Sequence, residues 1–396
     1  MSIRTLDLAD PTAQRVLLRV DCNVPMENGE VADDARLRTI APTIAKLRAR
    51  GAKVILLSHF DRPKGRRVES MSLRPLVEPL SRVIGTPIAF AQDCVGPVAA
   101  EAVAKMRPGD VLLLENLRFH SGEEANDPTF AGALAKNGDI YVNDAFSVAH
   151  RAHASTEAIT HLLPSFTGDA MRGELEALEA VLGSPKRPIL GIVGGSKVST
   201  KLALLRHLVV KLDKLAIGGG MANTFLFAQG WEVGGSYCEK HLADEARQVI
   251  DLARAEACEL LLPIDVVVAE RATYGVPVWT RGLGEIDDDE RILDAGPATI
   301  ARLNSAMEQV STLVWNGPLG VFETPPFGRG TFASAQHAAK LAREGKLIAI
   351  AGGGDTLAAL RQAGVATDFT YLSTAGGAFL EWLEGKTLPG VAALQA

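Results

Sequence analysis

The chain has 396 residues, more than one hydrophobic core usually organises, so its length predicts two domains. Its apolar share of 47% and charged share of 22% are those of a globular protein and exclude a disordered or fibrous one. The net charge of −6 disfavours nonspecific nucleic-acid binding, and no segment resembles a signal peptide or a membrane span. We therefore expect a cytoplasmic protein with no nucleic-acid partner and no membrane partner.

The pattern of short apolar runs predicts the fold class. Runs of Val, Ile and Leu alternate with longer helix-like stretches, which is typical of parallel sheets covered by helices. The fold class is therefore α/β, with two Rossmann-like domains. In the first half, we predict strands at residues 15–20, 53–58, 111–114 and 140–142. In the second half, we predict strands at residues 188–193, 215–217, 260–264, 313–315, 348–351 and 370–372, and helical stretches that include residues 202–211 and 244–257.

A helix-like segment separates the two halves. Residues 171–182 place Leu175, Leu178 and Leu182 on one face, and Gly183-Ser184-Pro185 should end the helix. We place the domain boundary in this segment. Further along, we expect the acidic run at residues 287–290 to be a solvated loop without a function of its own.

The four cysteines are far apart in the chain and form no C-x-x-C pair; they are Cys22, Cys94, Cys238 and Cys258. This spacing argues against both a disulfide framework and a zinc cluster. A reducing cytosol suits such cysteine usage best.

Polar and basic residues follow each predicted strand of the first half. The loops contain Arg19, Asp21, Asn23, His59, Arg62, Arg118, His120, Asn143, Asp144, His150, Arg151 and His153. Arg36 lies beyond the first loop, near a helix start signalled by Asp33 and Asp34, and Pro42 should restart or kink that helix. Ligands of open parallel sheets bind outside the carboxyl ends of the strands, so we expect these side chains to converge there.

The charge of the first segment suits an anionic ligand. Residues 1–75 carry 14 Lys and Arg against 9 Asp and Glu, a local charge of +5. Guanidinium groups match phosphate and carboxylate oxygens, so several arginines at neighbouring strand ends suit a phosphorylated carboxylic acid. Scattered surface charge is the alternative for the segment, and a surface ion pair is the alternative for any single arginine. His150 and His153 could bind a metal, but no further Cys or His ligands accompany them, so we expect none there.

A glycine-rich turn follows the first predicted strand of the second half. GGSKVSTK, residues 194–201, should form a tight turn that opens a helix, with Lys197 and Lys201 on one helix face. Glycines let backbone N–H groups approach phosphate oxygens, and a helix N-terminus favours negative charge, so the turn resembles a phosphate cradle. A plain strand-to-helix turn is an equal alternative. The Walker A and G-x-G-x-x-G motifs are absent, which weakens the P-loop and dinucleotide-binding hypotheses.

Later strands of the second half are also followed by glycines, at residues 218–220, 317, 352–354 and 376–377. Asp355 comes directly after three of them and could hold Mg²⁺, which prefers one or two carboxylates together with phosphate oxygens. It could equally cap a helix. Glu323 could accept hydrogen bonds from ribose hydroxyls, although alone it would be taken for a surface residue.

Assembled in order, these segments point to one family. Through the runs RVDCNVP, LENLRFH, HRAH, GGSKVSTK, WNGPLGVFE, GGGDT and EGKTLPGV, the chain resembles the phosphoglycerate kinases along nearly its whole length. The resemblance implies reversible phosphoryl transfer from 1,3-bisphosphoglycerate to Mg-ADP, giving 3-phosphoglycerate and ATP. It implies a phosphoglycerate-binding domain at residues 1–170, a hinge helix at 171–184 and a Mg-nucleotide domain at 185–377. Residues 378–396 would return to the first domain, and we expect a monomer.

The resemblance also assigns roles residue by residue. The family's phosphoglycerate contacts fall on Asp21, Asn23, Arg36, His59, Arg62, Arg118 and Arg151. Its nucleotide contacts fall on Lys201, Glu323, Gly353, Gly354, Asp355 and Thr356, with Asp355 at the Mg²⁺. The groups around the phosphoryl group in flight would be Arg36, Lys197, Gly353 and Gly354. In-line transfer needs no covalent enzyme intermediate and no general base, because carboxylate is a good leaving group.

Three positions depart from the family pattern. Asp61 replaces a glycine beside the expected anion site, Ala375 replaces a glycine after Ser373-Thr374, and Ile292 stands where a glycine commonly lies beside the nucleotide. We therefore assign no nucleotide contact to Ile292. Two alternative functions stay open: a catalytically silent scaffold of the same fold, favoured by Asp61 and Ile292, and a nucleotide-dependent dehydrogenase, disfavoured by the missing G-x-G-x-x-G.

Overall fold

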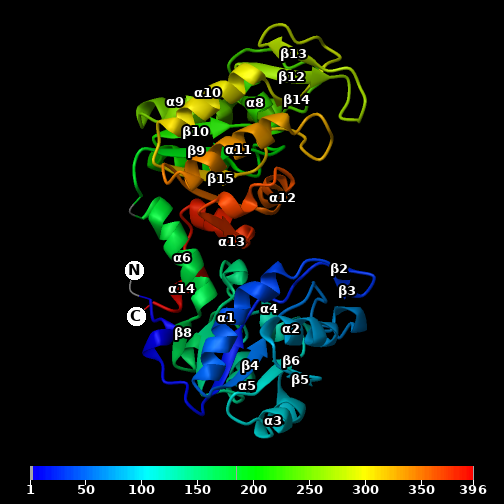
Figure 1. Ribbon diagram of the computed structural model, residues 1–396, viewed down its shortest axis with the longest axis vertical. Helices are drawn as coiled ribbons and strands as arrows, with labels where there is room; N and C mark the ends of the chain where they lie inside the picture. Colours follow the sequence, from blue (N-terminus) through cyan, green and yellow to red (C-terminus); the bar gives the residue numbers. More distant parts are fainter. Residues whose placement is uncertain (1–2, 184, 396) are drawn as a thin grey trace. The chain divides into compact units, whose positions relative to one another are not determined.

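The computed structural model describes residues 3–183 and 185–395 and divides into two compact units. The first unit holds the chain up to Glu176 and the segment from Thr387 onward, and the second unit holds Ala177–Lys386. Each unit has its own main sheet (Figure 1). Each also has its own hydrophobic core. Two expected features involve residues outside the described part of the chain: the helix end at Ser184 and the last residue of the returning segment, Ala396.

The first unit is built on a parallel sheet of six strands in the order β5-β6-β4-β1-β7-β8. The strands are β1 (Arg15–Arg19), β4 (Lys53–Leu57), β5 (Ile88–Ala91), β6 (Val111–Leu114), β7 (Ile140–Asn143) and β8 (Ser165–Thr167). The four central strands are those predicted, and nearly all of their residues are buried, as expected of strands covered on both faces. The prediction missed the edge strands β5 and β8, because they are short and only partly buried.

Helices and a small hairpin complete the first unit. They are α1 (Ala35–Ala49), α2 (Val77–Ile84), α3 (Gly96–Ala104), α4 (Ser121–Glu124), α5 (Pro128–Ala135), and the hairpin of β2 (Met26–Glu27) and β3 (Glu30–Val31). The start of α1 was predicted correctly, and Asp33 Oδ1 accepts a hydrogen bond from the Ala35 N–H at 2.9 Å. The expected restart at Pro42 was wrong, because α1 runs through it. Burial of Ile40 and Ile44 on the sheet offsets the hydrogen bond that proline cannot make.

The second unit contains a parallel sheet of six strands in the order β11-β10-β9-β15-β16-β17. Its strands are β9 (Ile189–Val193), β10 (Lys214–Ile217), β11 (Glu259–Leu261), β15 (Thr312–Asn316), β16 (Ile348–Gly352) and β17 (Tyr371–Ser373). All six were predicted. Its helices are α7 (Leu202–Lys211), α8 (Gly220–Ala228), α9 (Ala243–Ala255), α10 (Pro297–Glu308), α11 (Arg329–Arg343), α12 (Gly354–Gln362) and α13 (Gly377–Leu383). Trp315, fully buried on β15, belongs to the main core of this unit.

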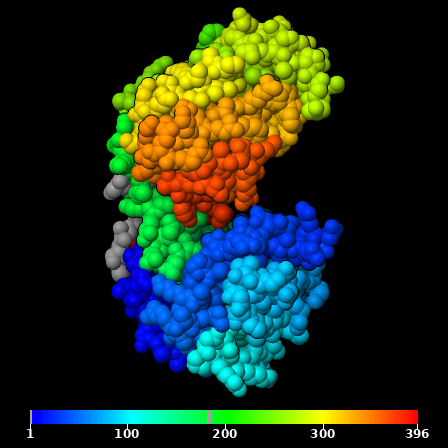
Figure 2. All heavy atoms as spheres, in the orientation of Figure 1, coloured from blue at the N-terminus to red at the C-terminus, as the bar shows by residue number. Residues whose placement is uncertain are grey.

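A second, antiparallel sheet in this unit was missed by the prediction. It consists of β12 (Asp265–Ala269), β13 (Trp279–Gly282) and β14 (Arg291–Ala295), in the order β13-β12-β14, and it projects from the second unit (Figure 2). The expectation of a wholly solvated acidic run was wrong at Glu290. This side chain is buried and pairs with Arg281 Nη2 on β13 at 2.7 Å, whereas residues 287–289 are exposed.

Helix α6 (Asp169–Leu182) begins in the first unit and ends in the second. It matches the helix predicted at residues 171–182; Leu175 and Leu178 are buried, and the side chain of Leu182 lies outside the described part of the chain. Near the C-terminus, α13 belongs to the second unit and packs against α7. The segment that belongs to the first unit begins at Thr387, not at residue 378, and contains α14 (Pro389–Ala392).

Candidate active site

The carboxyl ends of β1, β4, β6 and β7 bring the expected anion-binding residues of the first unit together. These four strands are neighbours in the sheet, so the loops that follow them meet at one edge. Asn23 links two of the loops, because its Oδ1 accepts a hydrogen bond from the Asp61 N–H at 2.9 Å. Asp61 links a third, because its carbonyl oxygen accepts a hydrogen bond from Arg118 Nη1 at 2.7 Å. The convergence predicted from the strand ends is therefore present for Asn23 and Arg118.

Arg36 reaches this edge from the first turn of α1. Its Nη1 donates to the carbonyl oxygen of Asn23 at 2.7 Å and lies 3.0 Å from Asp21 Oδ2. The same carboxylate oxygen accepts a hydrogen bond from Ser147 Oγ at 2.6 Å. The Arg36 side chain is 34% exposed, so it is held in place and still open to a ligand.

Arg118 is the least satisfied cation of the site. It lies in the short 3-10 helix η4 (Leu117–Phe119) after β6 and is 3% exposed. Its Nε lies 3.4 Å from Glu124 Oε1, but Nε and Nη2 are buried without a hydrogen-bond partner among the described residues. Burial, and then the neighbouring charge of Arg151, lower the pKa of Arg118 to about 10. A buried donor without a hydrogen-bond partner destabilises the folded protein. These two N–H groups therefore indicate a site for an anion that would accept hydrogen bonds from them.

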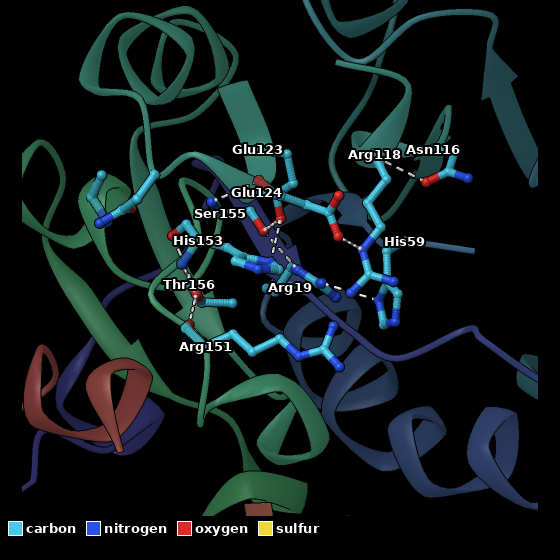
Figure 3. Close-up of polar contacts among 12 residues, drawn as sticks. Arg19, His59, Asn116, Arg118, Glu123, Glu124, Arg151, His153, Ser155 and Thr156 are labelled. Atoms are coloured by element: carbon cyan, nitrogen blue, oxygen red, sulfur yellow. Dashed lines mark hydrogen bonds and ion pairs between the residues drawn. The ribbon is translucent and has the colours of Figure 1, made fainter. Parts of the chain in front are cut away.

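His59 lies at the centre of the cations. Figure 3 shows the side chains of Arg118 and Arg151 pointing toward its ring, and Arg19 Nη2 lies 3.1 Å from His59 Nδ1. Burial and these positive charges hold the pKa of His59 well below its usual value. The ring is therefore neutral at physiological pH. Arg19 was part of a quoted motif but received no role from sequence reasoning.

Arg62 and Arg151 lie at the margin of the group. Arg62 is exposed on the loop after β4 and makes no hydrogen bond to the cluster within the described part of the chain. Arg151 is half-buried, and its Nε lies 3.2 Å from His150 Nε2. The first unit thus connects Asp21, Asn23, Arg36 and Arg118 through hydrogen bonds and an ion pair. The His59 ring contacts Arg19, and Arg62 and Arg151 lie beside this set.

The loops of this unit also contain residues with metal-ligand chemistry. Asp93, Cys94 and His120 offer ligand atoms within 4.8 Å of one another, a grouping that cysteine spacing alone did not reveal. His120 Nε2 already contacts Asp93 Oδ1 at 2.7 Å, and burial raises the pKa of the Cys94 thiol. The cluster is therefore satisfied without an ion.

Burial lowers the pKa of His153 to about 3, so its 3.8 Å contact with Glu123 is no ion pair at neutral pH.

The glycine-rich turn of the second unit differs from the expected helix start. Helix α7 begins at Leu202, so Lys197 and Lys201 both precede it, and the expectation that they share a helix face was wrong. Lys201 is half-buried, and its Nζ donates to the Gly194 carbonyl oxygen and to Asn316 Oδ1, both at 2.6 Å. Burial lowers its pKa to about 8. Lys197 is exposed, which leaves its charge free to meet a phosphate.

The second glycine-rich turn opens α12. Gly353 has a φ of +100°, and a Cβ at this position would lie 2.7 Å from Asn316 Nδ2, so only glycine fits. Asp355 is exposed in the first turn of α12, where an N-terminus favours negative charge nearby. Thr356 is buried; its hydroxyl donates to the Gly352 carbonyl oxygen at 2.9 Å and accepts from the Gly317 N–H at 2.7 Å. The Thr356 hydroxyl is thus engaged within the protein.

A cavity of about 610 Å³ lies between these turns and β14 in the second unit. Its lining includes Gly195, the three glycines at residues 218–220, Glu323 and Asp355. Five of the expected residues are not among those that line it: Lys197, Lys201, Gly353, Gly354 and Thr356. Ile292 also lines the cavity, and its N–H donates to Ser236 Oγ at 2.8 Å. The volume suits a drug-sized ligand, and the glycines would admit one closely. Sequence reasoning placed Glu323 and Asp355 here but missed Asp294, a buried wall residue whose pKa is raised to about 7 by burial.

The comparisons with known proteins identify the family of the chain. The family model described as phosphoglycerate kinase matches residues 6–386. The chain belongs to the phosphoglycerate kinase family. It is 63% identical to the phosphoglycerate kinase of Caulobacter vibrioides (strain NA1000 / CB15N) over 396 residues, which cover 100% of both chains. It is 58% identical to that of Bradyrhizobium diazoefficiens over 392 residues, covering 99% of this chain and 98% of the relative.

The similar solved structures are also phosphoglycerate kinases. The phosphoglycerate kinase of Coxiella burnetii superposes with a TM-score of 0.91 at 40% identity, covering 99% of both chains. That of Pyrococcus horikoshii OT3 has a TM-score of 0.82 at 28% identity, covering 99% of this chain and 98% of the other. The expected family, fold class and enzyme class, a phosphotransferase with a carboxyl group as acceptor, are confirmed. In the described part of the chain, no helix is both long and apolar enough to cross a membrane.

Proposed function

We propose that the first unit binds 3-phosphoglycerate and 1,3-bisphosphoglycerate through the cations at its strand ends. The observation that carries this assignment is Arg118, whose buried Nε and Nη2 have no hydrogen-bond partner in the described part of the chain. A phosphate or carboxylate group would satisfy both donors and compensate the buried charge. Arg36, Arg62 and Arg151 would add charge, and Asp21 and Asn23 would orient hydroxyl groups.

The second unit would bind the nucleotide in the glycine-lined cavity. Lys201 and the turns that begin α8 and α12 would face its phosphates, and Glu323 would accept from ribose hydroxyls. Because the Thr356 hydroxyl is already bonded, its contact would run through the backbone N–H at the start of α12. The donor set also fits Mg²⁺, since Asp355 is an exposed carboxylate at the cavity wall. Mg²⁺ bound there would neutralise phosphate charge.

We propose the following course for the reaction. An oxygen of the ADP β-phosphate attacks the acyl phosphorus of 1,3-bisphosphoglycerate in line, and the bond to the carboxylate oxygen breaks, which releases 3-phosphoglycerate. Arg36, Lys197 and the amides of Gly353 and Gly354 would stabilise the charge on the transferring group. No proton has to move, because carboxylate leaves as an anion. In other enzymes, removal of one hydrogen-bond donor of this kind raises the activation free energy by about 2.7–4 kcal/mol.

Two bound substrates on two units imply a conformational step. The continuous helix α6 belongs to both units, so bending about it is our proposed route to contact between the substrates. Exclusion of water would also protect the acyl phosphate from hydrolysis. Small-angle scattering should show smaller dimensions with both substrates than with either alone; identical dimensions would contradict closure. A monomeric state and a cytoplasmic location are further expectations, and light scattering checks the first.

The deciding experiment measures acyl phosphate formation from ATP and 3-phosphoglycerate, trapped with hydroxylamine. We expect the parent to be active and Lys197→Ala to lose roughly two to three orders of magnitude in kcat. Arg118→Met should lose phosphoglycerate binding while the free protein keeps its stability, because the removal of two buried donors without hydrogen-bond partners offsets the loss of the 3.4 Å ion pair with Glu124. Lys240→Ala, a lysine whose Nζ lies over the Phe227 ring, serves as a control for a lost lysine. An inactive, folded parent that binds Mg-ATP would instead favour the silent scaffold.

A further inference from the structure

Arg19 is a fully buried cation beside the first-unit site, and the proposed reaction gives it no role. It ends β1 and is 0% exposed. Its Nε donates to Ser155 Oγ at 2.9 Å, and its Nη1 donates to the Val20 carbonyl oxygen. Its Nη2 lies 3.1 Å from His59 Nδ1. A guanidinium group held on three sides has one orientation, so it can fix the ring that it touches.

The counter-charge of Arg19 is equally buried. Glu123, in α4, is 0% exposed, and its two carboxylate oxygens accept from Ser155 Oγ at 2.6 Å and from the Ser155 N–H at 3.0 Å. The Ser155 hydroxyl therefore accepts from Arg19 and donates to Glu123 (Figure 3). This relay spans three segments of the first unit. It links Arg19 through Ser155 to an acidic side chain whose pKa is raised by burial and lowered in part by the charge of Arg19.

The contact with Arg19 decides where the His59 ring carries its proton. Arginine has five N–H donors and no acceptor, so His59 Nδ1 must accept the hydrogen bond. The single proton of a neutral imidazole then lies on Nε2. We propose that Arg19 is a positioning residue that holds His59 as the Nε2-protonated neutral tautomer, which donates a hydrogen bond to an anionic oxygen of phosphoglycerate. The donor role of Nε2 rests on the proposed function; the tautomer does not.

The surrounding charges explain why a neutral donor suits this position. The ring faces Arg19 from β1, Arg118 from η4, Arg151 from the loop after β7 and Arg36 from α1. A protonated imidazole would add a further positive charge beside four arginines that already repel one another before the ligand binds. A neutral ring supplies a directed N–H without that repulsion, and these cations with burial keep its pKa low.

Nitrogen NMR of the substrate-free protein with labelled histidines tests the tautomer directly. His59→Gln identifies the His59 signals among those of the 8 histidines. We expect a protonated Nε2 and an unprotonated Nδ1, with both shifts constant from about pH 5.5 to pH 8, where a free histidine titrates. A proton on Nδ1, or titration with the ordinary pKa of histidine, would overturn the proposal. The measurement needs no ligand, so a failure of phosphoglycerate binding is distinguishable from a failure of this inference.

A matched pair of variants tests the cause. Arg19→Met removes the donor to His59, so we expect mixed tautomers and about tenfold weaker binding of 3-phosphoglycerate. Ser155→Ala removes a different hydrogen bond of Arg19 and should leave the tautomer unchanged. If Arg19→Met does not fold because Glu123 loses its counter-charge, the double variant with Glu123→Gln replaces it. An unchanged His59 spectrum without Arg19 would contradict the positioning role.

Discussion

At the scale of single residues, Asp61 occupies a backbone conformation that favours glycine. Its φ is +52°, while its N–H and carbonyl oxygen bond to Asn23 and Arg118. Asp is among the few residues that tolerate this region through local hydrogen bonds, at a cost. The two backbone hydrogen bonds hold the loop in place, and the aspartate side chain adds a negative charge beside the proposed anion site.

Replacing Asp61 should therefore have two separable effects. Asp61→Gly should stabilise the first unit by about 1 kcal/mol through the relieved φ, measured by hydrogen exchange in β1 and β4. It should also bind 3-phosphoglycerate about two- to fivefold more tightly at low salt, because a repulsive charge is lost. Asp61→Asn is the control, since it removes the charge and keeps a side chain that tolerates positive φ. Equal stabilisation by both variants would contradict the backbone explanation.

Residues that act from strand ends could be predicted, whereas their buried supports could not. Arg36, His59 and Arg118 follow strands of a parallel sheet, and topology alone sends such residues to one edge. Arg19, by contrast, is held partly by Ser155, which lies 136 residues later in the chain. A single sequence carries no signal for a hydrogen bond of that kind.

At the scale of elements, the two adjacent glycines at the start of α12 should respond differently to substitution, although we assign them the same role. Gly353→Ala should destabilise the second unit by about 1–3 kcal/mol and weaken Mg-ATP binding, because its Cβ would meet Asn316 at positive φ. Gly354→Ala has open space and should stay within about 0.5 kcal/mol of the parent. The 4 tryptophans all lie in the second unit, so tryptophan fluorescence in urea measures its unfolding. Equal losses in both variants would refute this account.

Asp294 connects β14 to α11 and should make the second unit sensitive to pH. Its carboxylate accepts from the Gly330 N–H at 2.8 Å and the Ala295 N–H at 2.9 Å, yet burial raises its pKa from 3.8 to about 7. The folded state holds this proton more tightly than the unfolded state. Its stabilising contribution is therefore complete below pH 3.8 and is lost as the pH rises through about 7.

The pH dependence can be isolated by comparison with Asp294→Asn, which cannot titrate. We expect the free energy of unfolding of the parent, relative to this variant, to fall by up to roughly 1.4 kcal/mol for each pH unit in that window. Urea titrations followed by tryptophan fluorescence supply both curves. Parallel curves would mean that Asp294 keeps an ordinary pKa in the folded protein.

The elements that could be predicted are those with an unambiguous periodicity. Strands buried on both faces have continuous apolar runs, so β9 and β15 were evident. The β12–β14 sheet is partly exposed, and its edge strand β13 has no buried residue, so it leaves no such run. Lys197 and Lys201 were placed on a helix because their spacing suits one, but Lys201 bonds to neighbouring turns instead.

At the scale of the whole molecule, residues 388–394 are packed into the first unit. Leu388, Val391 and Leu394 are buried, and the Gly390 N–H donates to the Ala149 carbonyl oxygen at 2.9 Å. Leu394→Ala should cost the first unit about 2–5 kcal/mol. Leu8→Ala, at a leucine that is 74% exposed, should cost little. Circular dichroism should register the loss, whereas the tryptophan transition of the second unit should not move; an equal shift in that transition would contradict separate cores.

Length alone predicted two domains, and the buried strands predicted both main sheets, because these features depend on local composition. The point at which the returning segment joins the first unit was placed nine residues too early. The boundary falls between Leu383, which belongs to the second unit, and Leu388, which belongs to the first. Both leucines are buried and equally apolar, so the sequence does not distinguish them. Tertiary packing decides between them.

The route of the chain between its units has a consequence for biosynthesis. The second unit is one uninterrupted stretch, Ala177–Lys386, so all of its residues are synthesised before Thr387 and the residues that follow it. The first unit, although begun first, lacks part of its core until those residues leave the ribosome. Translation therefore finishes the second unit before the first, and an early stop codon in the final segment would leave a nascent chain with its N-terminal half incompletely folded.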